Sequence, residues 1–229
     1  MTMKQLIAPI ALIATLPILA ACAAESPPQA RVEADVTPAA TAVASEVETA
    51  SAFDFSALPS GTYTDENGHA YIHFSYDHQG YSRPILRWGE FDATVEYDSE
   101  TPENSTLNVT IPVESIDSMV PAFNDHLKSA DFFDVATYPT ITFRSTALNI
   151  NPDGSGTITG DLTMKDVTRE ITFDGQLNKI GQHLRSGKDM FGISGTGTLM
   201  RSDYDLGRFA PNVGDEVTLM IEVEFQKAD

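Results

Sequence analysis

The sequence predicts an all-β domain, an antiparallel barrel of about eight strands with one short helix capping an end. Three observations predict this fold. Apolar and polar residues alternate strictly over most of residues 91–225, turn-forming residues separate the alternating runs, and a single segment has helical spacing. Strict alternation is typical of antiparallel strands with one dry face and one wet face. A two-sheet sandwich has the same periodicity, so the pattern leaves both architectures open.

The alternating runs follow one another in short order along the chain. The last is the clearest, because Val217, Leu219 and Ile221 alternate with polar residues. The complete set is 91–97, 107–113, 141–143, 158–164, 171–173, 191–199 and 217–225. Turn signals are Asn67-Gly68, Pro152-Asp153-Gly154 and the stretch from Asn212 to Gly214. A barrel of about eight strands is either filled by its own side chains or holds one small ligand.

Residues 118–127 break the alternation. Met119, Val120, Phe123 and Leu127 recur at helical spacing, and Ser118 precedes them as a candidate N-cap. A proline follows inside the first turn, a position where its missing N–H costs nothing. We therefore expect one helix, which covers one end of the barrel.

Residues 1–21 have the layout of a secretory signal peptide, with Lys4, an uncharged run from Leu6 to Leu19, and small residues before Cys22. The apolar run of about 14 residues is shorter than the ~20 needed to span a bilayer as a helix. Leu-Ala-Ala-Cys resembles the lipobox of bacterial lipoproteins, in which the cysteine is acylated and becomes the mature N-terminus. The alternative is an ordinary secreted protein with a chance cysteine. The sequence has no second cysteine for an intrachain disulfide.

Residues 22–56 are expected to be the lipidated cysteine and a disordered tether. The stretch is rich in Ala, Val, Thr, Ser, Glu and Pro, and Phe53 is its first aromatic residue after Cys22. Such a composition buries too little apolar surface to offset the entropy of ordering. A random coil of roughly 30 residues has a typical reach of about 30 Å. Residues 57–229 then form one domain.

The charge of the chain argues against nucleic-acid binding. Residues 54–229 carry 28 acidic and 12 basic side chains, a net charge of −16. Such a surface repels phosphate backbones and anionic headgroups, and no basic run offsets it.

From residue 61 onward, several motifs resemble the YceI-like family of bacterial periplasmic proteins. The longest are LKSADFFDV at 127–135 and YPTITFRS at 138–145; the others are DHQGYS at 77–82, GEF at 89–91, GDLT at 160–163, RSDY at 201–204 and VGDEV at 213–217. Two departures concern details of the family pattern. Lys165-Asp166 stands where the family often has His-Gly, and Gly207 comes two residues later than usual after the Arg-Ser-Asp motif.

The resemblance implies a lipocalin-like barrel whose long apolar pocket binds a polyisoprenoid chain, either a polyprenyl diphosphate or the tail of a quinone. The chain is then an envelope carrier, attached through Cys22 to the periplasmic side of the outer membrane, since Ala23 stands where an Asp commonly signals inner-membrane retention. No further cofactor is expected, and the oligomeric state stays open. Two other functions remain: an enzyme of the same fold acting on a hydrophobic substrate, or a structural envelope protein with a packed barrel.

Candidate ligand-binding residues come from the matched motifs and their neighbours. His78 lies in the matched first turn and has a ring that can hydrogen-bond a ligand head. Arg83 and Arg144 are cations that could meet a diphosphate or a quinone carbonyl, although each could equally face outward. The aromatic candidates, each of which could also be plain core, are Trp88, Phe91, Phe132, Phe133, Phe143 and Phe173.

Metal binding and catalysis have little support. His69 and His73 are four residues apart, a spacing that in a strand separates them by about 13 Å, too far for one zinc. Ser194 lies in a strand and lacks the glycine pattern of a nucleophile elbow. We therefore expect neither a metal site nor a catalytic residue. The acidic domain slightly favours a neutral quinone head over a diphosphate, because a diphosphate needs several arginines at one mouth.

Overall fold

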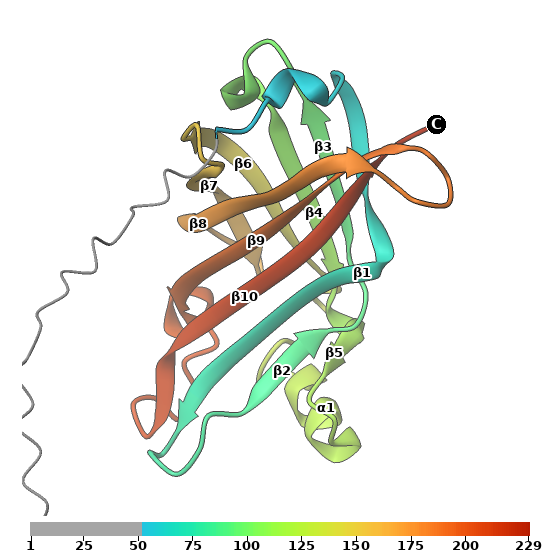
Figure 1. Ribbon diagram of the computed structural model, residues 1–229. Helices are drawn as coiled ribbons and strands as arrows, with labels where there is room; N and C mark the ends of the chain where they lie inside the picture. The colour runs from blue at the N-terminus through green and yellow to red at the C-terminus, as the bar shows by residue number, and fades with distance from the viewer. Residues whose placement is uncertain (1–51) are drawn as a thin grey trace, which may run out of the picture. The chain divides into compact units, whose positions relative to one another are not determined.

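The computed structural model describes residues 52–229, which form a single antiparallel sheet of ten strands with one α-helix (Figure 1). The expected signal peptide and Cys22 lie outside the described residues. The strands are β1 (Gly61–His78), β2 (Ile85–Trp88), β3 (Asp92–Tyr97), β4 (Thr106–Pro112), β5 (Ile116–Asp117), β6 (Thr140–Ile150), β7 (Ser155–Met164), β8 (Val167–Gln182), β9 (Asp189–Met200) and β10 (Val213–Lys227). All seven alternating runs of the sequence lie largely within strands.

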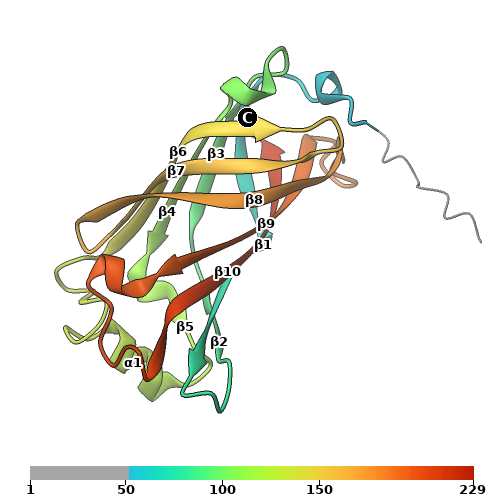
Figure 2. The same ribbon diagram turned by 90° about the vertical axis from the view of Figure 1, so that its left-hand side faces the viewer.

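The sheet closes on itself as an eight-stranded barrel, which settles the choice between barrel and sandwich. β1 pairs with the last strand, β10, from Tyr63↔Lys227 to His78↔Val213. The remaining strands follow in the order β10-β9-β8-β7-β6-β4-β3-β1. The short strands β2 and β5 pair beside β1 at the lower end of the barrel, next to the helix (Figures 1 and 2). Closure leaves the eight long strands without a free edge between them.

β1 runs through the point where the sequence predicts a turn, so that prediction is wrong. Asn67 and Gly68 lie within the strand, at a register shift between Asp65 and Ala70 in the pairing with β10. The extra residues are absorbed as an irregularity of the strand, as in a β-bulge, and the chain does not reverse. The predicted turn at residues 152–154 is present between β6 and β7, where Gly154 has a positive φ of 80°.

The lumen of the barrel is filled from alternate positions of every long strand, as the period of two requires. On β1, for example, Ile72 and Phe74 are buried and their neighbours are less so. The buried apolar side chains form one core cluster, which includes Tyr63, Phe91, Phe143, Phe173, Phe191 and Phe225. The buried apolar residues of the barrel therefore converge on a single interior.

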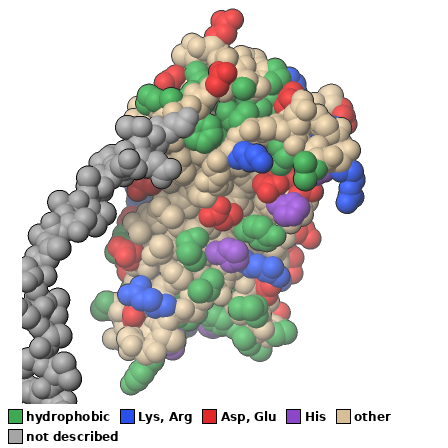
Figure 3. Space-filling model, viewed as in Figure 1, with side chains coloured by type: hydrophobic (Ala, Val, Ile, Leu, Met, Phe, Trp, Pro, Cys, Tyr) green, Lys and Arg blue, Asp and Glu red, His purple; other side chains and the backbone are tan. Residues whose placement is uncertain are grey.

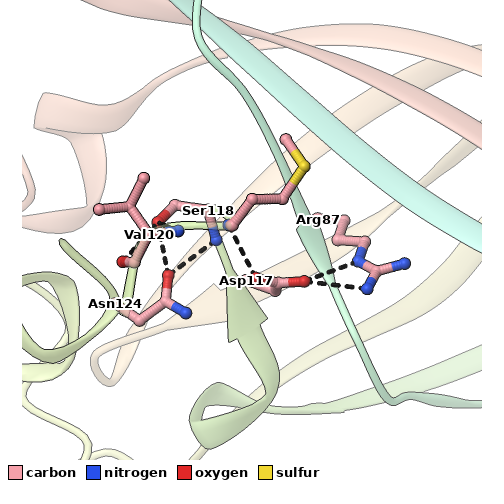
Figure 4. A network of polar contacts seen from close by, with 6 residues as sticks. Arg87, Asp117, Ser118, Val120 and Asn124 are labelled. Atoms are coloured by element: carbon pink, nitrogen blue, oxygen red, sulfur yellow. Dashed lines mark hydrogen bonds and ion pairs between the residues drawn. The ribbon is translucent and has the colours of Figure 1, made fainter. Parts of the chain in front are cut away.

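The α-helix is shorter than the sequence predicts. α1 spans Pro121–Lys128, and its N-cap is Val120 rather than Ser118. Pro121 occupies the first turn, and the side chain of Ser118 instead donates to Oδ1 of Asn124 at 2.5 Å, as does its backbone N–H at 2.7 Å (Figure 4). Ser118 thus fastens the connection from β5 to the helix without capping it. α1 covers the lower end of the barrel, as expected (Figure 1).

The opposite end of the barrel carries the first described residues. A short 3₁₀ helix, η1 (Phe55–Ala57), leads to the fully buried Leu58. The N–H of Phe53 donates to the carbonyl of Pro152 at 2.8 Å, and the hydroxyl of Tyr97 donates to the carbonyl of Phe55 at 2.9 Å. Residues 53–56, which fall in the expected tether, are therefore bound to the barrel.

A candidate lipid-binding column inside the barrel

The largest of three cavities inside the barrel lies at its α1 end and has a volume of about 260 Å³. Strands β1, β2 and β10 contribute its walls, and α1 closes one side with Phe123, His126 and Leu127. The residues after the helix contribute Phe132 and Phe133, and the loop before β10 contributes Arg208 and Phe209. The lining is overwhelmingly apolar and aromatic, which is typical of a site for a hydrophobic ligand.

Two smaller cavities continue the same interior toward the other end. The middle cavity has about 120 Å³ and shares Trp88, Met164, Leu199 and Leu219 with the first. The far cavity has about 110 Å³ and shares Leu107, Ile158 and Ile193 with the middle one. Because neighbouring cavities share walls, they form one apolar column along the barrel, closed at its far end by Phe55 and Leu58.

The histidines and arginines that line this column all lie at its α1 end, whereas the far cavity is lined in part by neutral polar residues such as Tyr97, Asn149 and Gln176. Tyr76 and His78 follow Phe74 on the inward face of β1, so the strand changes from apolar to polar toward the mouth. Burial raises the pKa of the Tyr76 hydroxyl, which therefore stays protonated as a hydrogen-bond donor at neutral pH. His126 lies across the cavity on α1, with its ring 4.9 Å from that of Phe132.

Arg201 lies in the wall of the mouth but is bound to the backbone. Its side chain is only 8% exposed, and burial lowers the pKa of its guanidinium. Nε donates to the carbonyl of Gly214 and Nη2 to that of Val213, both at 2.8 Å. Nη1 donates to the carbonyls of Leu206 and Arg208. Arg201 thus holds the loop between β9 and β10 in place, and most of its donors are occupied.

The other arginine of the mouth is paired as well. Nη1 of Arg208 contacts Oδ1 of Asp131, which follows α1. This ion pair joins the loop before β10 to the segment after the helix. The positive charge of Arg208 is therefore largely balanced before any ligand arrives.

The structure brings most of the predicted site residues into this column. His78, Phe132 and Phe133 line the first cavity, and Trp88 lines the first and middle ones. The middle cavity is lined by Phe91, Phe143 and Phe173.

Arg83 and Arg144 line none of the three cavities. Both side chains are exposed. Arg144 lies between two buried residues of β6, Phe143 and Ser145, so the alternation of the strand turns it outward. Arg83 lies in the connection between β1 and β2, outside the barrel interior.

Sequence reasoning missed several wall residues. Phe209 and Arg208 belong to an irregular loop, where no periodicity indicates which side chains face the cavity. Tyr76 continues the alternation of Ile72 and Phe74 on the inward face of β1. The turn predicted at Asn67-Gly68 kept this stretch from being recognised as part of one long strand. His126 lines the first cavity from the exposed face of α1. Nothing in the sequence distinguishes it from an ordinary surface histidine.

Within residues 52–229, no cluster of three or more His, Cys, Asp or Glu side chains has a geometry that fits a metal ion. The same described residues contain no helix with the length and hydrophobicity to cross a membrane. A separate hollow of about 490 Å³ lies outside the barrel and is lined by polar residues that include His69, Glu222 and Glu224.

The profile of the YceI-like domain matches residues 63–225, which span the whole barrel from β1 to β10. The chain belongs to the YceI-like family. Protein YceI of Escherichia coli is 35% identical over 159 residues, which cover 69% of this chain and 82% of that protein. A UPF0312 protein of Ectopseudomonas mendocina is 32% identical over 166 residues, which cover 70% of this chain and 84% of the relative.

Three solved structures have a similar fold. The YceI protein of Campylobacter jejuni aligns with a TM-score of 0.61 and 26% identity, covering 67% of this chain and 90% of its own. BcnA of Burkholderia cenocepacia aligns with a TM-score of 0.63 and 22% identity, covering 70% and 98%. A polyisoprenoid binding domain from Saccharophagus degradans aligns with a TM-score of 0.54 and 12% identity, covering 74% and 100%.

Proposed function

We propose that this YceI-like protein is a carrier or sequestering protein of the bacterial envelope that holds an isoprenoid-type lipid in its barrel. The observation that carries the proposal is the apolar column of three cavities with shared walls. A long, largely apolar interior with histidines and arginines at one end suits a molecule with a long apolar tail and a small polar head. The description of the Saccharophagus degradans domain as polyisoprenoid binding points to the same class of ligand.

The physical basis of binding is burial of the tail. Each CH₂ moved from water into an apolar environment gains about 0.8 kcal/mol. A prenyl tail therefore binds tightly without any covalent step. Among the described residues that line the three cavities none is an aspartate or glutamate, so the column offers no carboxylate for acid–base chemistry. This lining favours binding over catalysis.

The groups at the mouth favour a neutral head over a diphosphate. Arg208 is paired with Asp131, and the guanidinium of Arg201 donates to four backbone carbonyls. A diphosphate requires free positive charge in place of its hydration shell. A quinone carbonyl requires only one or two hydrogen-bond donors, and Tyr76, His78 and His126 can supply them. The proposed ligand is therefore a polyprenyl quinone, with the head at the α1 end.

The proposal includes attachment of the chain to the periplasmic side of the outer membrane through acylated Cys22. Support comes from the sequence, in which an apolar run and a lipobox-like Leu-Ala-Ala-Cys precede an alanine at residue 23. A lipid anchor keeps the carrier close to the membrane in which its ligand dissolves.

Native mass spectrometry of the protein purified from its own membranes tests the class of ligand, and a co-purified mass of an isoprenoid lipid is the expected result. Titration with a quinone and a diphosphate of equal tail length, at low and high salt, then tests the head. We expect the quinone to bind at least as tightly, with little dependence on salt. A diphosphate that binds more than about tenfold tighter, and loses this advantage in salt, would contradict the neutral head.

A further inference from the structure

Exposed apolar side chains gather at the α1 end of the barrel. Tyr81 is 87% exposed and Met119 is 76% exposed, and Phe209, Val120 and Ile85 are each more than half exposed. They come from three separate connections: the turn between β1 and β2 with the start of β2, the link from β5 to α1, and the loop before β10. Figure 3 shows hydrophobic side chains in green over α1 and at the lower tip of the molecule. We call these five residues the apolar rim.

The apolar rim adjoins the cavity of about 260 Å³ at the α1 end. Phe209 lines the cavity itself, and its ring lies 6.3 Å from that of Phe132 in the cavity wall. The N–H of Tyr81 donates to the carbonyl of His78, a wall residue, at 3.0 Å. Val120 accepts from the N–H of Phe123 at 2.9 Å, and Ile85 precedes the buried wall residue Leu86. Four of the five rim residues are thus lining residues or are joined to one, and the fifth, Met119, directly precedes Val120.

The rim is held in place by a defined network. The N–H of Met119 donates to Oδ1 of Asp117 at 2.8 Å, and Oδ2 of Asp117 accepts from Nε of Arg87 at 3.0 Å (Figure 4). These bonds lower the pKa of the Asp117 carboxyl, so the network is intact at neutral pH. Met119 itself has a positive φ of 62°, a conformation that a residue with a side chain rarely adopts. The backbone is therefore fixed in a form that presents the methionine to solvent.

Three cations near the rim have partners. Arg87 pairs with Asp117, Lys128 pairs with Glu114 at 2.7 Å, and Arg208 pairs with Asp131. Arg83, between Tyr81 and Ile85, is exposed and takes part in none of the ion pairs of residues 52–229. With this one unpaired arginine the rim is mainly apolar, so we expect burial of apolar area to contribute more to its binding than attraction to anionic headgroups.

We propose that the apolar rim docks on the surface of a phospholipid bilayer, so that the ligand passes between the membrane and the barrel without crossing water. This inference rests on the proposed function, because a ligand of the apolar column is dissolved in lipid. The rim adjoins the α1 end of the column, where the head of the proposed ligand lies. A protein partner or a second copy on the rim would instead cover the mouth.

The length of the preceding chain is compatible with docking on the membrane that holds the N-terminus. The described chain begins at the end opposite α1 (Figures 1 and 2). β10 has 15 residues, a length of about 50 Å at the rise of a strand. Residues 23–51 reach about 100 Å when fully extended. That stretch of chain is therefore long enough for the barrel to turn its rim toward the anchoring membrane.

The test uses the full chain with Cys22→Ala, so that one introduced cysteine can be labelled with an environment-sensitive fluorophore. The rim position is Met119→Cys. The control is Leu184→Cys, a fully exposed site in the turn between β8 and β9, away from α1 (Figure 1). Both chains keep residues 1–51, so any attachment through that segment is equal. Vesicles of phosphatidylcholine carry a spin-labelled lipid that quenches fluorescence in the headgroup and upper acyl region, and they contain no isoprenoid.

We expect the label at residue 119 to shift to the blue and to lose about half of its fluorescence, because docked apolar surfaces lie about 5–10 Å into the interface. The label at residue 184 is expected to stay in water. Adding Tyr81→Ser and Phe209→Ser to the Met119→Cys chain should return its quenching to the control value. Equal quenching at 119 and 184, or quenching at 119 that survives the serine changes, would overturn bilayer docking. The result is independent of ligand binding, which the quinone titration measures separately.

Discussion

The ring of Phe173 occupies the space that a side chain at residue 197 would need. A Cβ atom on Gly197 would lie 2.6 Å from Cδ1 of Phe173. The Phe173 ring packs edge-on against that of Phe143, with a distance of 5.5 Å between centroids, and Phe143 in turn lies over Gly160. Glycines in the wall therefore let two large rings fit in the barrel beside the middle cavity. The free width of the column depends on these contacts.

Gly197→Ala is expected to push the Phe173 ring into the middle cavity. Overpacking of this kind costs about 1–3 kcal/mol of unfolding free energy, and tail binding should weaken in parallel. Gly192→Ala on the same strand is the matched control, because a Cβ atom there would lie no closer than 4.0 Å to its nearest neighbour, the carbonyl oxygen of Val223. Urea denaturation and quinone titration of both variants check the prediction. Equal behaviour of the two would show that the ring does not depend on Gly197.

Arg201→Lys is expected to loosen the loop between β9 and β10. The change leaves backbone carbonyls without their donors, and each unsatisfied buried group costs about 1–3 kcal/mol, so we expect a loss of about 3 kcal/mol in unfolding free energy. Arg144→Lys on the exposed face of β6 should change stability by less than about 0.5 kcal/mol. Urea denaturation measures both. A loss at Arg201 no larger than that at Arg144 would mean that the carbonyls find other partners.

The free energy of unfolding should fall at high pH because of two buried tyrosines at the far end of the barrel. Burial raises the pKa values of Tyr63 and Tyr97 from 10.0 to about 12 in the folded protein. A group with a raised pKa contributes stability that is complete below pH 10 and is lost as the pH rises through about 12. The double variant Tyr63→Phe, Tyr97→Phe should therefore show a flatter stability curve than the parent between these values. Thermal melts across this pH range test the sign of the effect. Identical slopes of stability against pH for the parent and the double variant would refute the prediction.

Acylation of Cys22 predicts that radiolabelled palmitate enters the parent chain and not Cys22→Ala when each is expressed in a bacterial host. The physical reason is that the sequence contains a single thiol. Cell fractionation should place the parent chain with the outer membrane. Equal labelling of both chains would rule out the anchor.

Much of the barrel was predictable because alternation is a local property of the sequence. The alternating runs within β9 and β10 show this clearly. The same alternation explains why Arg144 faces outward between Phe143 and Ser145. Strand pairing is not local, however. The closure of the barrel depends on contacts between Tyr63 and Lys227, residues at opposite ends of the domain, and periodicity alone could not separate it from a sandwich.

The site was predictable in its aromatic walls and less so at its mouth. Phe132 and Phe133 lie in a motif whose resemblance to the family is long and specific, whereas Phe209 lies in an irregular loop. The role of Arg201 depends on the folded path of residues 206–214, because its partners are backbone carbonyls. No residue type in the sequence indicates such a partner. Asn67-Gly68 led to a wrong prediction of a turn, because the same dipeptide can also lie at an irregularity within a strand.

If the column binds an isoprenoid tail, the affinity for quinones with one head and increasingly long tails depends on the length of the tail. We expect the affinity to rise by about tenfold or more with each isoprene unit until the three cavities are filled, and then to level off, since burial of each CH₂ contributes about 0.8 kcal/mol. In Leu199→Trp, a change at a residue shared by the first and middle cavities, the rise should stop at a shorter tail. An affinity that is the same for every tail length would show that the column does not bind the tail.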